Sequence, residues 1–154
     1  MKTTKFITAP VVALFFVFFS FNVFAQSYSE AQTNLTIDHQ LIMKHANAIA
    51  SGEAKTKNDQ VTHYNEFRKS LAEAKKVHNL LKKVIPEKAK SEAVIHHDNI
   101  DKYYASATSH ANAMMEELKN EKPDDAKLKE HAKKLRDDIQ LAEKENQALI
   151  KEAL

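Results

Sequence analysis

The chain has 154 residues, with 23 Lys and Arg against 21 Asp and Glu, and it contains no cysteine. The lack of cysteine excludes disulfides, thiol catalysis, cysteine-ligated zinc and iron–sulfur centres, and the C-x-x-C-H attachment of c-type haem. The near balance of charge argues against nucleic acid or an anionic membrane surface as the main partner, because both need a clustered positive excess.

Residues 1–25 are typical of a cleaved secretory signal peptide. Lys2 and Lys5 precede an apolar run rich in Phe and Val. Val23 and Ala25 then occupy the −3 and −1 positions of a signal-peptidase site. We therefore expect the protein to be exported, to the periplasm or out of the cell.

Cleavage at this site would leave Gln26 as the new N-terminus, and residues 26–154 would form one domain. An uncleaved membrane anchor is the alternative, since residues 7–24 are nearly long enough to span a bilayer. No stretch beyond residue 25 is apolar on all sides, so we expect no membrane span in the mature chain.

Residues that break helices are scarce after the signal segment. Gly52, Pro86 and Pro123 are the only glycine and prolines there, while Ala, Lys, Glu and Leu abound. These three residues divide the mature chain into four lengths. We predict helices at residues 28–51, 57–85, 87–119 and 124–152.

Capping residues support these boundaries. Ser27-x-x-Glu30 and Thr56-x-x-Asp59 both match a capping box at a helix start. The break at Pro86 has no glycine beside it, so a kinked continuous helix is the alternative there.

Apolar residues recur at spacings of three and four in each predicted helix, and Lys and Glu occupy the opposite face. In the first helix the stripe consists of Leu35, Leu41, Ile42, Ala48 and Ile49. One apolar stripe on each of four helices with short connections is typical of a helix bundle. The sequence thus predicts an all-α fold, a single antiparallel up-down four-helix bundle after the signal peptide.

Two ionisable residues lie on the apolar face of the first helix. Asp38 is an expected buried polar residue, and Tyr103 or Tyr104 would donate a hydrogen bond to it. His45 is surrounded by Leu41, Ile42 and Ala48. A buried ionisable group is costly unless it is paired or ligates a metal, so His45 is either a satisfied core histidine or a ligand. His39 has no evident partner.

In an antiparallel arrangement of the predicted helices, four histidines fall at one height along the bundle. Antiparallel helices place residues equidistant from a turn at one height. Reflection of His45 through the turn near residue 54 reaches His63, and reflection through Pro86 then reaches a position next to His110. The last turn brings His131 to the same height. Met43 and Met114 lie close to it in sequence, so we predict a ligand layer of His45, His63, His110, His131, Met43 and Met114.

A secondary metal candidate lies around the Pro86 turn. It consists of His78, His96, His97 and Asp101. A His-x-x-x-Asp face on one helix can bind a divalent ion. The alternative is an ordinary charged surface.

These histidines predict a protein that binds a transition metal. Imidazole suits zinc and copper, and thioether favours Cu(I). A b-type haem held by His and Met is a related hypothesis. The sequence has no Glu-x-x-His pair, no H-E-x-x-H, no G-x-S-x-G and no phosphate-binding loop, so we do not expect an enzyme. The alternative function is a structural or protein-interaction module that binds no ligand and meets another exported protein or a second copy of itself as a homodimer.

Overall fold

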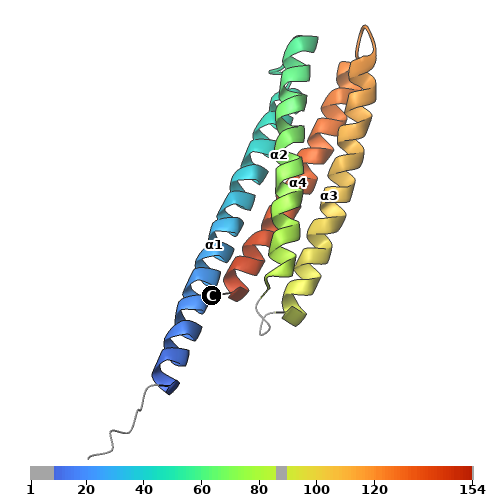
Figure 1. Cartoon of the computed structure of the whole chain (residues 1–154). Helices are drawn as coiled ribbons and strands as arrows, with labels where there is room; N and C mark the ends of the chain where they lie inside the picture. Colours follow the sequence, from blue (N-terminus) through green and yellow to red (C-terminus); the bar gives the residue numbers. More distant parts are fainter. Residues whose placement is uncertain (1–8, 86–89, 154) are drawn as a thin grey trace, which may run out of the picture.

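The described residues form four α-helices and no strand (Figure 1). The computed structural model describes the backbone of residues 9–85 and 90–153, and the side chains of residues 28–85 and 91–151. The helices are α1 (Ala9–Ala50), α2 (Lys57–Lys83), α3 (Lys90–Lys119) and α4 (Asp125–Ala153). The prediction of an all-helical chain with four helices is confirmed.

The helix boundaries at the connection between α1 and α2 follow the sequence signals closely. Thr56 Oγ1 accepts a hydrogen bond from the Asp59 amide at 3.1 Å, and Asp59 Oδ2 accepts one from the Thr56 amide at 3.1 Å. Gly52 has a φ of +80°, a backbone conformation that L side chains rarely adopt. The predicted capping box and the glycine turn are therefore both formed.

Three helix boundaries differ from the prediction by two residues or more. The helix α1 begins at Ala9 and runs without a break past Gln26, so Ser27 does not start a helix. The helices on either side of the Pro86 turn end and begin at Lys83 and Lys90, slightly further from the proline than predicted. Pro86 itself lies outside the described residues.

The core follows a strict seven-residue repeat. Buried positions alternate in steps of four and three along each helix, the spacing of helices that pack side by side in a supercoil. In α1 the repeat consists of Tyr28, Gln32, Leu35, His39, Ile42, Ala46 and Ile49. The same steps run from Gln60 to Leu81, from Ala93 to Leu118 and from Leu128 to Leu149.

This repeat corrects the stripe predicted for the first helix. Leu41 is 37 % exposed, whereas His39 is fully buried. Adjacent helical residues point about 100° apart, so a stripe centred on His39 carries Ile42 inward and turns Leu41 outward. The apolar side chains in the sequence suggested a wider stripe than the core admits.

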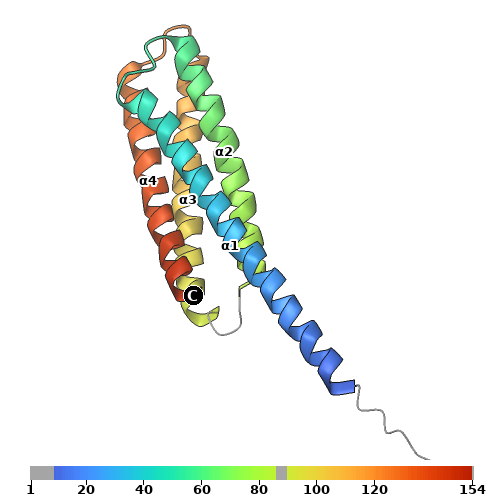
Figure 2. The same cartoon turned by 90° about the vertical axis from the view of Figure 1, so that its left-hand side faces the viewer.

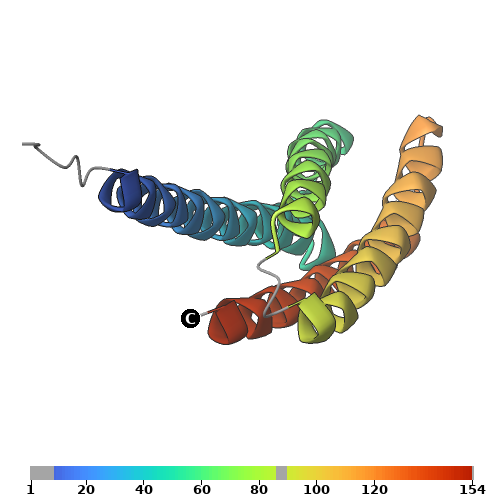
Figure 3. The ribbon, with the colours of Figure 1, turned by 60° about the horizontal axis from the view of Figure 1, so that its bottom comes forward.

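The helices are not equally packed. The α3–α4 interface is the most extensive, α1–α2 and α1–α4 follow, and α2–α3 is the smallest of these four. Figures 2 and 3 show α1 beside α4, with α2 against α1 and α3 against α4. The structure thus consists of two hairpins that meet mainly through α1 and α4. Within the described residues no helix has the length and apolar character needed to cross a membrane.

Candidate histidine pairs

Six of the eight histidines form three pairs, and each pair joins two different helices. The pairs are His45 with His63, His78 with His97, and His110 with His131. The two remaining histidines, His39 and His96, contact glutamates of α4. Each of the four helix interfaces named above therefore contains a histidine contact.

The first pair joins α1 to α2. The Nδ1 atoms of His45 and His63 are 2.9 Å apart, and both side chains are half-buried. Burial lowers the pKa of His45, and the neighbouring His63 and Lys44 lower it further, against an opposing effect of Glu66. A neutral His45 can share one hydrogen with His63, or both Nδ1 lone pairs can face a cation.

The second pair joins α3 to α4. The Nδ1 atoms of His110 and His131 are 3.2 Å apart, and both side chains are half-buried. The other ring nitrogen of His110, Nε2, lies 4.0 Å from Asp138 Oδ2. Burial lowers the pKa of His110, and Asp138 partly offsets this effect. Asp138 Oδ2 has no hydrogen-bond partner, so this carboxylate oxygen is available to hold the imidazole.

The predicted layer of four histidines is thus divided into two pairs. Within the described part of the chain, no three His, Asp or Glu side chains are arranged to hold one metal ion. The methionines pack with the apolar core: Met114 is fully buried and Met43 is half-buried against the same cluster. The hairpins bring each pair together, but each histidine flanks the core stripe instead of pointing to the centre of the bundle.

The third pair is buried. The rings of His78 and His97 lie 4.9 Å apart between centroids, and each residue is 1 % exposed. None of the four ring nitrogens has a hydrogen-bond partner. Asp101 Oδ1 approaches His78 Nε2 to 3.2 Å, but outside hydrogen-bond geometry. An unpaired buried polar group costs about 1–3 kcal/mol, so this pair calls for an explanation.

The secondary candidate of the sequence is therefore formed only in part. His78, His97 and Asp101 lie together, whereas His96 points to α4 and contacts Glu145. Burial lowers the pKa of His78 to about 4, against an opposing effect of Asp101. Burial and the neighbouring His78 lower the pKa of His97 to about 4 as well. Both rings are neutral near pH 7.

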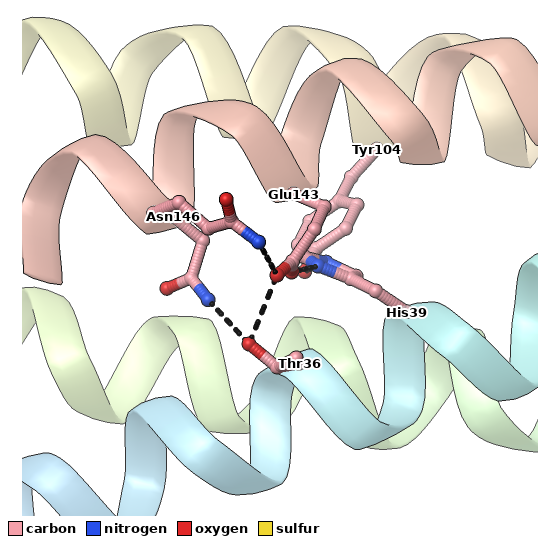
Figure 4. A network of polar contacts seen from close by, with 6 residues as sticks. Thr36, His39, Tyr104, Glu143 and Asn146 are labelled. Atoms are coloured by element: carbon pink, nitrogen blue, oxygen red, sulfur yellow. Dashed lines mark hydrogen bonds and ion pairs between the residues drawn. The ribbon is translucent and has the colours of Figure 1, made fainter.

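A buried polar network, not predicted from the sequence, links α1, α3 and α4 (Figure 4). His39 Nδ1 lies 2.6 Å from Glu143 Oε2, and His39 Nε2 lies 2.6 Å from the Tyr104 hydroxyl. Thr36 donates to Glu143 at 3.0 Å, and Asn146 donates to Thr36 at 3.2 Å. Steps of four and three residues from Leu35 to Ile49 place position 39 on the core face of α1. This spacing is the sequence signal that could have predicted a buried His39.

The charges of Glu143 and Tyr104 in this network follow from their surroundings. Burial alone would raise the pKa of Glu143, but hydrogen bonds from His39, Gln147 and Thr36 hold it below its usual value. Burial, together with the nearby Asp38 and Glu143, raises the pKa of Tyr104. Tyr104 is thus a neutral phenol bonded to His39 Nε2, and the Glu143 carboxylate accepts a hydrogen bond from His39 Nδ1.

Asp38 does not have the predicted role. It is half-buried, and it makes no hydrogen bond to Tyr103 or Tyr104. Burial and the nearby Glu73 raise its pKa, against an opposing effect of His39. The hydroxyl of Tyr104 bonds to the neighbouring His39 instead, because position 39 is the one that faces the core.

Comparison with known proteins adds no family to this description: the chain matches no family model, no curated protein and no solved structure.

Proposed function

We propose that this protein is an exported, antiparallel four-helix bundle that binds copper or zinc through histidine pairs on neighbouring helices. The observation that carries the proposal is the approach of two Nδ1 atoms, 2.9 Å in the His45–His63 pair and 3.2 Å in the His110–His131 pair. Two nitrogens bound to one tetrahedral zinc at 2.0–2.1 Å lie about 3.3 Å apart. A single ion would replace the shared hydrogen of each pair with little movement.

The His110–His131 pair supports this proposal most strongly. Histidines that ligate a metal commonly donate the other ring N–H to a carboxylate, which orients the imidazole. Asp138 lies on that side of His110, 4.0 Å from Nε2. The half-buried position of both rings leaves room for water or an external ligand in the remaining coordination positions.

The same distances favour a bare ion over haem. A b-type haem held by His and Met would need one of these imidazoles to be free to ligate beside a methionine thioether, whereas each already faces a second imidazole at 2.9 or 3.2 Å. Binding or buffering of an ion is therefore the proposed role, without a catalytic step.

A melting experiment tests the proposal. Zinc or copper should raise the melting temperature of the purified protein, because an ion that binds only the folded state stabilises it. His110→Ala should remove part of this increase. His96→Ala is the matched control, since His96 also lies on α3 but contacts Glu145 instead of a histidine. If neither metal moves the melting temperature, the histidine pairs are not metal sites.

A second candidate function is an interaction module without a ligand. Large apolar side chains are exposed on either side of the α2–α3 connection, namely Leu80 (52 %), Val94 (47 %) and Ile95 (64 %). Exposed apolar groups of this kind are found at protein–protein contacts. A metal-insensitive protein whose Leu80→Lys or Ile95→Lys variant loses an exported partner or self-association would favour this function.

A further inference from the structure

The feature least explained by a folded, ligand-free bundle is the buried pair of His78 and His97. Both side chains are 1 % exposed, yet none of their ring nitrogens makes a hydrogen bond of normal geometry, and His78 Nε2 contacts Asp101 at 3.2 Å outside that geometry. Buried polar groups are nearly always hydrogen-bonded, and the exceptions indicate an ion, a water molecule or a functional role. Two neutral imidazoles with free lone pairs are also the ligands that zinc and copper select.

A carboxylate completes the donor set. Asp101 Oδ1 lies 3.2 Å from His78 Nε2, close to the distance of about 3.3 Å between two ligands of a tetrahedral zinc ion. The side chain of Asp101 is 44 % exposed and its other oxygen pairs with Lys82. Two imidazoles and one carboxylate form a common set of zinc ligands, with water in the fourth position.

The surroundings of the pair also suit a bound ion. The ring of Tyr104 packs edge-on against His78 at 5.6 Å between centroids and limits its rotation. The carboxylate is the exposed member of the set, since the side chain of Asp101 is 44 % exposed while both rings are buried. Because the described residues hold no preformed set of three ligands, binding would turn Asp101 from Lys82 towards the two rings.

We propose that His78, His97 and Asp101 form a zinc site that joins α2 to α3. This site is separate from the two half-buried pairs, His45–His63 and His110–His131. The position of this site has a structural consequence. The His45–His63 pair lies within the first hairpin, α1 and α2. The His110–His131 pair lies within the second hairpin, α3 and α4. Of the three histidine pairs, only His78–His97 joins the two hairpins, across the α2–α3 interface, so zinc there would hold the bundle closed.

The test begins with a background variant in which both half-buried histidine pairs are removed. It contains H45Q, H63Q, H110Q and H131Q in the full chain. Native mass spectrometry should detect one zinc ion per chain in this variant. Cobalt(II), used as a spectroscopic probe, should show the intense visible bands of a tetrahedral site.

Adding His97→Leu to the background should abolish both signals. Leucine replaces an unpartnered imidazole by an apolar side chain, so the metal-free variant should melt at the same or a higher temperature. Asp101→Asn is a second variant at a half-exposed position, and it should weaken zinc binding while helicity is unchanged. Asp98→Asn is its matched control on the exposed face of α3 and should bind zinc like the background.

The outcomes separate this inference from the proposed function. A wild-type protein that binds zinc, with a background variant that binds none, would overturn the buried site and leave the proposed function standing. A background variant that binds as much zinc as the wild type would support the buried site and overturn the proposal that the half-buried pairs bind metal. Zinc binding that survives both His97→Leu and Asp101→Asn would also overturn the inference.

Discussion

His39 on α1 and Glu143 on α4 lie 2.6 Å apart in the core, although 104 residues separate them in the chain. Tyr104 of α3 bonds to the opposite nitrogen of the same ring at 2.6 Å. One imidazole therefore joins three helices. A polar contact of this kind favours one register of the helices over others, because any shift leaves buried groups unpaired.

Tyr104→Phe should destabilise the protein. The substitution removes only the hydroxyl and leaves His39 Nε2 buried without a partner, which costs about 1–3 kcal/mol. Urea denaturation measures the free energy of unfolding. Tyr103→Phe is the matched control at the preceding residue, which is half-buried. It should change the free energy of unfolding by less than about 0.5 kcal/mol. Equal effects at both tyrosines would contradict the network.

Ile42→Ala and Leu41→Ala should differ sharply. Ile42 is fully buried, so its truncation should cost about 2–5 kcal/mol. Leu41 is 37 % exposed, and its truncation should cost less than about 1 kcal/mol. Thermal or urea unfolding of the two variants tests which face of α1 packs inward. A larger loss at Leu41 would show that α1 is rotated relative to the described register.

Stability of the metal-free protein should fall with acidification. Burial lowers the pKa of His78 and His97 to about 4 from 6.5, so the unfolded state binds more protons between these values. The free energy of unfolding therefore decreases as the pH falls from about 6.5 to about 4, and the contribution of the pair levels off below that. Urea titrations across this range measure the slope.

A variant with His78→Leu and His97→Leu is the control for that slope, since it removes both titrating groups. The dependence on pH should become flatter above about pH 5 in this variant. The loss of the Glu143 contribution begins lower, below the usual carboxylate value of 4.5, because the folded state lowers the pKa of Glu143. An unchanged slope in the double variant would place the acid-sensitive groups elsewhere.

Asp138→Asn should weaken zinc binding at the His110–His131 pair. Removing the carboxylate that orients a ligating imidazole typically reduces metal affinity by about 10–100-fold. Isothermal titration calorimetry with zinc measures the change. Asp137→Asn is the control, because Asp137 bonds to Arg136 at 2.8 Å instead of a histidine. Identical affinities in the two variants would argue against a role of Asp138.

Export makes a simple prediction about the N-terminus. If signal peptidase cleaves after Ala25, N-terminal analysis of the protein recovered from the extracytoplasmic fraction should begin at Gln26, unless that residue has cyclised. A membrane-bound form that retains Met1 would instead support the uncleaved anchor.

The sequence by itself determined the helices and the local pairings. Thr56, Asp59 and Gly52 define the first turn through backbone hydrogen bonds and a left-handed φ, which depend on a few adjacent residues. A short turn also sets the register of the two helices it joins. Reflection through the turns therefore matched His45 with His63 and His110 with His131.

Only the tertiary structure decided which side of each helix faces the centre and how the two hairpins meet. A rotation of about 100° separates His39 in the core from Asp38 at its edge, and both lie in the same apolar stretch of sequence. The contact of His39 with Glu143 joins α1 to α4, which are not consecutive in the chain. No short turn sets that distance, because it results from packing complete helix faces against one another.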